Sequence, residues 1–367
     1  MKNVISTYIR TWPLEQGSRK DGLFWSADMV NTEYLTDINI AFALINADDK
    51  HSIYIPAAHD FSNLWNEVSG FKKKNPDLKV NISIGGWGAE HFSDMACDSD
   101  LREKFSAGVC DWLLKYDLDG VDIDWEYPAR PSSWQSIKSR PDDAVNYVSL
   151  LKDLRIAADI LGEKTKKHYS LSTAVPAAGW FPSVIDVASA SKFVDAFKLM
   201  AYDYYGGWSS ITGHHCNIFK NQNDPSGGWS TDQAVNDYLN AGVPPQKIQM
   251  GAAFYGRAFS GVEGGADNDG LFQPFKSGSF PENERYGTWT QLKKVLKPDS
   301  GFTRFWDDKA KAPYLYNGDI WITYCDEELI KNLVTYSKEK GLGGFFSWEF
   351  GTDINAELLK VLYENAL

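Results

Sequence analysis

Short runs of β-branched and aromatic residues recur along the chain, separated by polar turns and by segments with helical spacing. Eight of these runs predict strands, at residues 4–9, 38–44, 80–85, 120–126, 169–175, 196–203, 248–255 and 343–349. Helices are predicted at residues 101–115, 144–161, 327–340 and 355–366. This alternation predicts an α/β fold, a closed (β/α)8 TIM barrel whose parallel strands are joined by right-handed crossovers.

One interval is longer than a single βα unit needs. About ninety residues separate the seventh and eighth predicted strands, and residues 258–323 are rich in Gly, Asp, Phe and Tyr. This part has apolar residues of its own, namely Phe302, Phe305, Trp306, Tyr314 and Tyr316. The sequence therefore predicts a small α+β insertion at 258–323, between two parts of the barrel at 1–257 and 324–367.

Net charge and hydropathy argue against two classes of partner. Lys and Arg number 37 and Asp and Glu 49, a formal net charge of −12, which argues against binding of nucleic acid. The sequence contains no run of about eighteen apolar residues, so it predicts no membrane span. The N-terminal residues have no extended apolar core, so we expect either no leader or a numbering that begins after its removal.

The cysteines do not indicate a metal or redox site. Cys97, Cys110, Cys216 and Cys325 are far apart and form no C-x-x-C pair. Buried thiols are commoner than a disulfide framework in a chain of this size, and the sequence leaves the disulfide state open. We predict neither a cofactor nor a bound metal. The 14 Trp residues, in contrast, suit a surface that stacks on the flat apolar faces of sugar rings.

The stretch DLDGVDIDWEYP at residues 117–128 has the apolar character of a buried strand and yet contains Asp119, Asp122, Asp124 and Glu126. Successive side chains of a strand face opposite ways, so Asp122, Asp124 and Glu126 share one face, and the apolar residues between them share the other. In a closed barrel these three acids line the interior. Glu126 then reaches the C-terminal rim, where the active sites of such barrels are built.

Crowded carboxylates in a place of low polarity raise the pKa of at least one of them. A carboxylic acid that stays protonated near neutral pH can serve as a general acid. Two other interpretations remain open. The acids could be paired with buried Arg or Lys, although no basic cluster lies nearby in the sequence, or they could bind magnesium or calcium. The interleaved apolar residues argue against the metal site.

The acidic run resembles the D-x-x-D-x-D-x-E signature of the family-18 glycoside hydrolases, the chitinases, and matches it without a gap from Asp119 to Glu126. Residues 83–86 (SIGG) are similar to the S-x-G-G motif of that family, and residues 200–203 (MAYD) to its M-x-Y-D motif. Residues 254–257 (FYGR) and Trp348 also match, so the resemblance spans the predicted barrel. The insertion is similar to the α+β domain that deepens the cleft in one chitinase subgroup.

This resemblance implies hydrolysis of β-1,4-linked N-acetylglucosamine polymers with retention of configuration, the acetamido oxygen of the substrate being the nucleophile. It implies that Glu126 is the general acid and base, and that Asp124 accepts the acetamido N–H and stabilises the oxazolinium ion. Asp122 would modulate Asp124 by sharing its proton or charge. Tyr202 would fix the acetamido group, with Asp203 close to the same subsite.

In a regular strand the side chain of Asp119 faces the opposite side from those of the other three acids, so we predict a structural role for Asp119. The resemblance also implies a set of substrate-binding residues along a cleft: Tyr8, Trp12, Phe42, Trp87, Met200, Trp208, Tyr255, Arg257 and Trp348. Loop packing or barrel filling is the alternative for several of them, whereas Trp348 is expected beneath the reacting sugar. His214 and His215 are adjacent, so on an extended segment they point apart and are not expected to bind one metal.

Three functions are compatible with these residues. A chitinase is favoured because Glu126, Asp124 and Tyr202 are all present, whereas a chitin-binding lectin on the same scaffold usually lacks the acid. An endo-β-N-acetylglucosaminidase acting on N-glycans uses the same chemistry, although the predicted insertion favours a linear polymer. The expected partner is chitin or a chitooligosaccharide, the expected location is extracellular because of this substrate class, and a monomer is the default oligomeric state.

Overall fold

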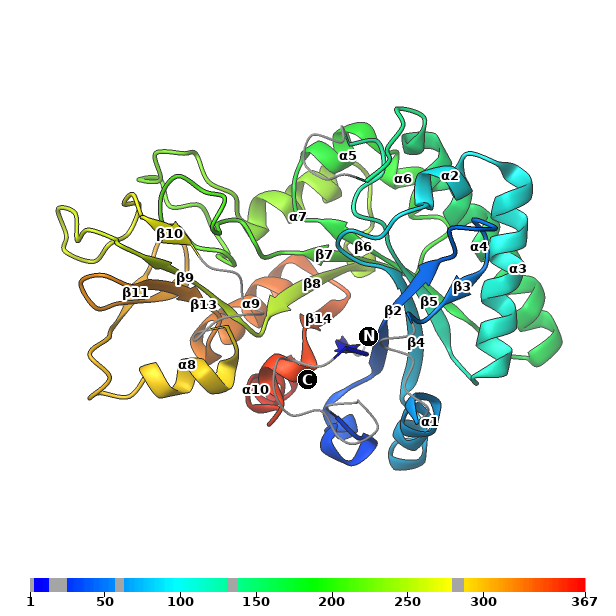
Figure 1. Cartoon of the computed structure of the whole chain (residues 1–367), viewed down its shortest axis with the longest axis horizontal. Coiled ribbons are helices and arrows are strands. Elements are labelled where there is room, and N and C mark those ends of the chain that lie inside the picture. Colours follow the sequence, from blue (N-terminus) through cyan, green and yellow to red (C-terminus); the bar gives the residue numbers. More distant parts are fainter. Residues whose placement is uncertain (1–2, 13–24, 57–62, 131–136, 279–286, 367) are drawn as a thin grey trace.

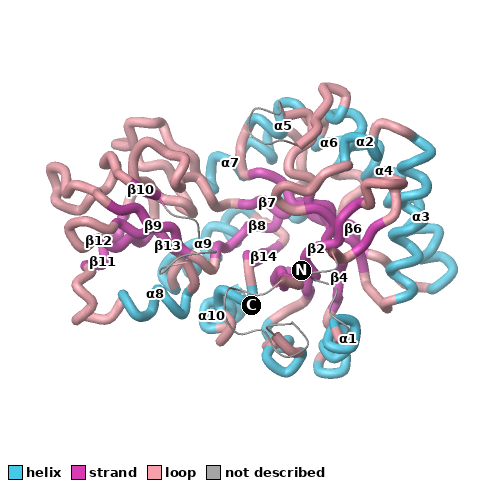
Figure 2. The backbone as a smooth tube through the Cα atoms, in the orientation of Figure 1, coloured by secondary structure: helices cyan, strands magenta, loops and turns pink. Residues whose placement is uncertain are grey.

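The computed structural model describes residues 3–12, 25–56, 63–130, 137–278 and 287–366. Within these ranges eight parallel strands follow the order β1-β14-β8-β7-β6-β5-β4-β2, and β2 pairs with β1, which closes the barrel (Figures 1 and 2). They are β1 (Val4–Arg10), β2 (Asp37–Ile45), β4 (Lys79–Gly85), β5 (Gly120–Asp124), β6 (Ser170–Pro176), β7 (Ala196–Met200), β8 (Ile248–Ala253) and β14 (Gly344–Trp348). The predicted TIM barrel is confirmed. A short strand that was not predicted, β3 (Ile53–Tyr54), pairs with β2 in the antiparallel direction.

Each predicted helix is present. They are α3 (Ser99–Lys115), α4 (Asp143–Thr165), α9 (Glu327–Lys340) and α10 (Glu357–Ala366). The further helices are α1 (Leu64–Lys74), α2 (Phe92–Ala96), α5 (Trp180–Val184), α6 (Val187–Ala190), α7 (Thr231–Asn240) and α8 (Trp289–Val295), with short 3-10 turns at Ala27–Met29, Thr32–Tyr34, Pro245–Lys247 and Phe350–Asp353. Helix α10 begins at Glu357 rather than 355 because Ala356 has a positive φ of 54°.

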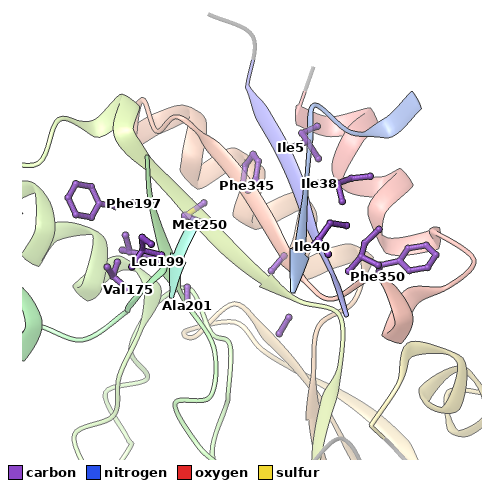
Figure 3. Close-up of a cluster of buried hydrophobic side chains, with 14 of the residues drawn as sticks. Ile5, Ile38, Ile40, Val175, Phe197, Leu199, Ala201, Met250, Phe345 and Phe350 are labelled. Atoms are coloured by element: carbon purple, nitrogen blue, oxygen red, sulfur yellow. The ribbon is translucent and has the colours of Figure 1, made fainter. Parts of the chain in front are cut away.

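The apolar face of the barrel strands packs against the helices. Ile123 on β5 and Trp125 just after it are buried, and the Trp125 ring stacks on Phe92 of α2 with centroids 5.3 Å apart. Figure 3 shows part of this layer, including Phe197 of β7 and Phe345 of β14. Burying one such side chain stabilises the fold by roughly 1.5–3 kcal/mol. Strand alternation leaves the opposite face, with its polar residues, for the barrel interior.

Three barrel strands end two or three residues earlier than predicted, and β14 ends one residue earlier, at Trp348. Strand β5 ends at Asp124 rather than 126, β7 at Met200 rather than 203, and β8 at Ala253 rather than 255. Beyond β7 the extended path is broken at Asp203, whose φ is 61°. Glu126 and Tyr202 therefore lie just past the strand ends, on the rim segments that leave the barrel.

A second, antiparallel sheet lies between β8 and β14 in the sequence and beside the barrel in space, on the left of Figure 1. Its order is β10-β9-β13-β12-β11, with β9 (Gly256–Ser260), β10 (Ser277–Gly278), β11 (Thr303–Asp307), β12 (Ala312–Tyr316) and β13 (Trp321–Tyr324). It has a small core of its own, made of Phe259, Val262, Tyr314, Tyr316 and Trp321. Strands β9 and β13 run across the predicted boundaries at 257 and 323, and the division into domains stays a prediction.

The two ends of the described chain lie side by side (Figure 1). The Asn3 side-chain amide donates a hydrogen bond of 2.8 Å to the carbonyl oxygen of Ala366, at the end of α10. Among the described helices, none combines the length and the apolar composition that crossing a membrane requires.

Candidate active site

The row of acids begins inside the barrel and ends at its rim. Asp122, Asp124 and Glu126 are 0%, 4% and 8% exposed. The S-x-G-G segment allows β4 to pass close to this row: Gly85 pairs with Asp124, and a Cβ at Gly85 would lie 2.0 Å from the Asp124 carbonyl oxygen. The Gly86 N–H donates to the same oxygen at 2.9 Å. Both glycines have a positive φ, so other residues would be strained there as well as crowded.

Asp122, the deepest acid of the row, accepts four hydrogen bonds. Its Oδ1 accepts from Ser172 Oγ at 2.6 Å and from Lys198 Nζ at 3.0 Å. Its Oδ2 accepts from the hydroxyls of Tyr8 and Ser83, both at 2.7 Å. Burial acts to raise the pKa of Asp122, but Lys198 and the hydroxyl donors outweigh it, so the pKa lies below its ordinary value.

The two outer acids are in a different electrostatic situation. Burial, the charge of Glu126 and the charge of Asp122 raise the pKa of Asp124 well above its ordinary value. Burial likewise raises the pKa of Glu126 to about 7; a hydrogen bond with Tyr127 acts against this rise, and Asp203 adds to it. The Asp124 Oδ1 accepts no hydrogen bond from the described residues. The outer acids are therefore able to hold a proton near neutral pH.

Asp203 is fixed at the rim by residues that follow β8 and β7. Its Oδ1 accepts from the Tyr255 hydroxyl at 2.6 Å and from Arg257 Nε at 2.7 Å, and His215 Nδ1 lies 3.7 Å from it. Burial acts to raise the pKa of Asp203, but Arg257 and His215 dominate and hold it well below the usual range. Tyr202 is the residue before Asp203, and the centroid of its ring lies 6.0 Å from that of the Tyr255 ring.

An aromatic cluster lies at the C-terminal ends of the barrel strands, next to the acids. It contains Tyr8, Trp12, Phe42, Met200, Tyr202, Phe346 and Trp348. The Phe42 ring stacks on Trp348 with centroids 5.7 Å apart and planes 17° apart, and on Trp12 at 5.9 Å and 26°. All of these residues except Phe346 were predicted from the sequence as site residues. Phe346 lies two residues before Trp348 on the same face of β14, so strand alternation could have identified it.

Two of the predicted tryptophans lie outside this cluster. Trp87 and Trp208 are 65% and 53% exposed. The ring of Tyr127, next to Glu126, lies 6.5 Å from Trp87 and 5.7 Å from Trp180, the first residue of α5. The guanidinium carbon of Arg257 lies 4.7 Å from the centre of the Trp208 ring. Exposed aromatic rings thus continue outward from the acids, and Trp180 was not singled out by any sequence motif.

Asp119 lies at the opposite end of β5 from Glu126. Its carboxylate pairs with Lys72 at 2.9 Å and with Lys167 at 2.6 Å, and it accepts the Val80 backbone N–H at 2.8 Å. These contacts join the start of β5 to α1, to the start of β4 and to the turn after α4. They are the contacts expected of a structural carboxylate.

The two adjacent histidines have separate partners. His214 Nε2 lies 3.0 Å from Asp307 Oδ2 on β11, whereas His215 lies beside Asp203 and packs on the Tyr255 ring with centroids 5.0 Å apart. Within the described ranges, no group of three His, Cys, Asp or Glu side chains is arranged to hold a metal ion. The four cysteines are present as free thiols.

The sequence of the chain matches the family Glycosyl hydrolases family 18 over residues 4–353. The chain belongs to this family. It is 34% identical to Chitinase A1 of Niallia circulans, over 80% of this chain and 43% of that protein, and 34% identical to Chitinase 1 of Aphanocladium album, over 89% and 77%. A probable endochitinase of Caenorhabditis elegans is 32% identical, and this chain covers 51% of it. The chain thus spans about half the length of two of these three relatives.

Solved structures of family-18 proteins superpose on nearly the whole chain. A family-18 N-acetylglucosaminidase from Paenibacillus barengoltzii has a TM-score of 0.86 and 33% identity, over 99% of both chains. A class V chitinase from Nicotiana tobaccum in complex with NAG4 has a TM-score of 0.84 and 26% identity, over 100% of this chain and 99% of that one. Both support the fold assigned to the chain, the barrel together with the sheet inserted between β8 and β14.

The family-18 motifs identified the acids but not the cation beside them. Lys198 precedes the M-x-Y-D motif on β7 by two residues and is 76 residues away from Asp122. Lys198, Met200 and Tyr202 are spaced two residues apart, so strand alternation predicts that their side chains share one face. This pattern could have identified Lys198. This isolated Lys lies in an apolar strand far from the acids in the sequence, so the residues close to the acids do not indicate the ion pair.

Proposed function

We propose that this chain is a chitinase, which hydrolyses β-1,4 linkages between N-acetylglucosamine units by a retaining, substrate-assisted mechanism. The observation that carries the proposal is the pair Glu126 and Asp124, two buried acids of raised pKa beside an aromatic cluster. The names of the family-18 relatives, several of them chitinases, support the same substrate class.

Glu126 is the general acid in this proposal. Its pKa of about 7 keeps a large fraction of the carboxyl protonated near neutral pH, because burial disfavours the charged form. The nearby cations Lys198 and Arg257 pair with Asp122 and Asp203 instead. The proton passes from Glu126 to the glycosidic oxygen as the bond from that oxygen to C1 breaks.

The acetamido oxygen of the substrate forms the new bond to C1 and gives an oxazolinium ion. Asp124 accepts the acetamido N–H, a role for which its Oδ1 has no competing donor from the described residues. Tyr202, at the edge of the aromatic cluster, fixes the acetamido group. Water then attacks C1, its proton returns to Glu126, and two inversions leave the configuration retained.

The aromatic rings supply the binding surface. Trp348, half-buried and stacked on Phe42, suits the floor beneath the reacting sugar, and a stacked ring contributes about 0.5–1.5 kcal/mol beyond its buried area. Exposed rings such as Trp87 and Trp208 suit sugar units further along the chain. Asp203, held by Tyr255 and Arg257, keeps the rim in place around them.

The test is incubation with chitohexaose, followed by separation of the products by length. Shorter chitooligosaccharides from the wild type, and none from Glu126→Gln prepared in the same way, are the expected result. Binding of chitohexaose without cleavage would instead favour a chitin-binding lectin. Release of glycans from a high-mannose glycoprotein, with chitohexaose left intact, would favour an endo-β-N-acetylglucosaminidase.

An exo-acting N-acetylglucosaminidase is the second candidate. The structure from Paenibacillus barengoltzii carries that name and superposes on 99% of both chains. Early products separate the two: single N-acetylglucosamine units from the start indicate exo action, and intermediate lengths indicate internal cleavage. An extracellular location and a monomeric state stay predictions.

A further inference from the structure

Lys198 is a charged side chain buried inside the barrel and has no role in the mechanism proposed above. It projects from β7, is 3% exposed, and its Nζ donates to Asp122 Oδ1 at 3.0 Å and to Asn39 Oδ1 at 2.8 Å. The Nζ also lies 5.0 Å from the centre of the Tyr8 ring. An ammonium group in this position must be balanced by a nearby anion, since an isolated buried charge costs several kcal/mol.

The hydrogen bonds around Asp122 favour the carboxylate over the protonated acid. Each carboxylate oxygen accepts two hydrogen bonds, from Ser172 and Lys198 at Oδ1 and from Tyr8 and Ser83 at Oδ2. A protonated carboxyl is a donor and needs one of these neighbours to accept. A hydroxyl can rotate and accept, but an ammonium has three N–H donors and no acceptor. Lys198 is therefore the one of the four that cannot adjust to a protonated Asp122.

We propose that Lys198 is a positioning residue that keeps Asp122 a carboxylate at every stage of the reaction, so that the exchangeable protons of the row lie on Asp124 and Glu126 alone. This deepens the proposed function, because it concerns the same row of acids, and its catalytic consequence rests on that function. It decides between the two modes of action open for Asp122: charge, and not proton sharing, is how Asp122 acts on Asp124.

The groups that face Asp122 come from every neighbouring strand. Tyr8 on β1 and Lys198 on β7 are the titratable ones, with Asp124 on its own strand. Hydroxyls of β4 and β6 complete the shell, and an amide oxygen of β2 accepts a hydrogen bond from Lys198. The phenol of Tyr147 on α4 lies further out, bonded to Thr173 at 2.7 Å. Among the groups around Asp122, Lys198 thus supplies the positive charge and Asp124 is the second acid. The other groups are neutral near pH 7.

The fixed carboxylate of Asp122 has a consequence for the next acid of the row. Its negative charge favours a proton on Asp124, and Lys198 opposes this in part. Asp124 then gains and loses its proton beside a permanent ion pair, Asp122 with Lys198, and shares no proton with Asp122. The charge of the row is controlled from a side chain that never touches the substrate.

The experiment is a carbon-13 titration of aspartate carboxyls in the full chain without substrate, with Asp122→Asn identifying the Asp122 resonance. In the wild type the Asp122 signal is expected to stay at its ionised position from about pH 5 to pH 8, because, against the effect of burial, the ion pair and the hydroxyl donors hold its pKa below the ordinary value of about 3.9. A wild-type Asp122 signal that titrates within this window would overturn the proposal. The titration itself is read from the wild type, and Asp122→Asn serves only to assign the resonance.

Two variants of Lys198 and one control test the cause. Lys198→Met removes the donor and the charge, and Lys198→Gln keeps an N–H donor but not the charge. Both are expected to move the Asp122 titration upward by about one pH unit or more, the size of effect typical of a lost neighbouring charge. Ser172→Ala removes a neutral donor from the same Oδ1 and is expected to leave Asp122 ionised.

Equal shifts in Lys198→Gln and Ser172→Ala would contradict the proposal, because they would make Lys198 one structural hydrogen bond among four. Thermal unfolding of each variant confirms that the titration reports a folded protein. The outcome is independent of chitin hydrolysis. Failure of the wild type to cleave chitohexaose would contradict the proposed function. Titration of the Asp122 signal in the wild type would contradict the role proposed for Lys198.

Discussion

The two ends of strand β5 carry carboxylates in opposite surroundings. Asp119, just before the strand, pairs with Lys72 and Lys167 and accepts a backbone N–H. Glu126, just beyond the other end, is buried, lies near Asp203, and has its pKa raised to about 7. The same signature therefore contains one acid that pairs with two lysines and another that burial favours as a neutral acid.

This difference follows from the architecture of the barrel more than from the residue type. At the N-terminal face, loops and helix ends bring side chains that stabilise the fold. At the C-terminal face, strand ends converge on a common space, where carboxylates crowd together and aromatic rings exclude water. The same carboxyl group is thus paired with lysines at one end and, in the proposed function, is reactive at the other.

The largest effect is expected at the reactive end. Glu126→Gln should lower kcat on chitohexaose by at least about 100-fold, because the proton donor is lost while a group of similar shape remains. Affinity for chitohexaose, measured by calorimetry, should change little. Activity equal to that of the wild type would mean that another residue is the acid, and would remove the contrast between the two ends.

Asp124→Asn should lower kcat by about tenfold or more, because an amide has no proton to lose and so never supplies the negative charge with which Asp124 stabilises the oxazolinium ion. It should also move the alkaline limb of the pH profile downward. Asp124 and Glu126 interact through their charges, and removing one negative charge makes the other acid easier to ionise. A profile of kcat/KM against pH for both proteins measures the shift, and an upward movement would be the contrary result.

Glu126 should also make the stability of the protein depend on pH. Its pKa rises from an ordinary value of 4.5 to about 7 on folding, so the unfolded chain loses this proton first and stability falls as pH rises through that window. Glu126→Gln cannot ionise, so its stability advantage over the wild type should grow from pH 4 to pH 8, by up to about 3 kcal/mol.

Urea unfolding of wild type and Glu126→Gln at several pH values measures this advantage. Asp353, buried beside the start of α10, has its pKa raised to about 7 by burial too, against backbone donors that lower it. It is present in both proteins, and its contribution cancels in the difference. A stability difference that stays constant with pH would show that burial of Glu126 does not favour its neutral form.

The smallest effect is expected at the structural end. Asp119→Asn should reduce the free energy of unfolding by about 1 kcal/mol, because partly exposed ion pairs contribute little and an amide still accepts the Val80 N–H. Its kcat on chitohexaose should equal that of the wild type. A large loss of activity without loss of stability would show that this end of β5 also takes part in the reaction.

Much of this comparison could be predicted from the sequence. The alternation of Asp122, Asp124 and Glu126 with apolar residues predicted which side chains share the barrel interior, and the eight strands were found where the patterns indicated. The rim was predicted less well. Strand patterns extended past the real ends of β5, β7 and β8, because the residues there keep strand-like composition although the regular strand pairing of the barrel has ended.

What the sequence determined by itself is the local order: which residues form strands, which face each side chain takes, and which acids stand in one row. These depend on backbone geometry and on burial of one face, which repeat over a few residues. Tertiary structure alone decided the charge states. Lys198 reaches Asp122, and Tyr255 and Arg257 reach Asp203, only because the barrel closes and brings distant strands within hydrogen-bonding distance. A pKa depends on such contacts and on burial, and neither is written in the neighbouring residues.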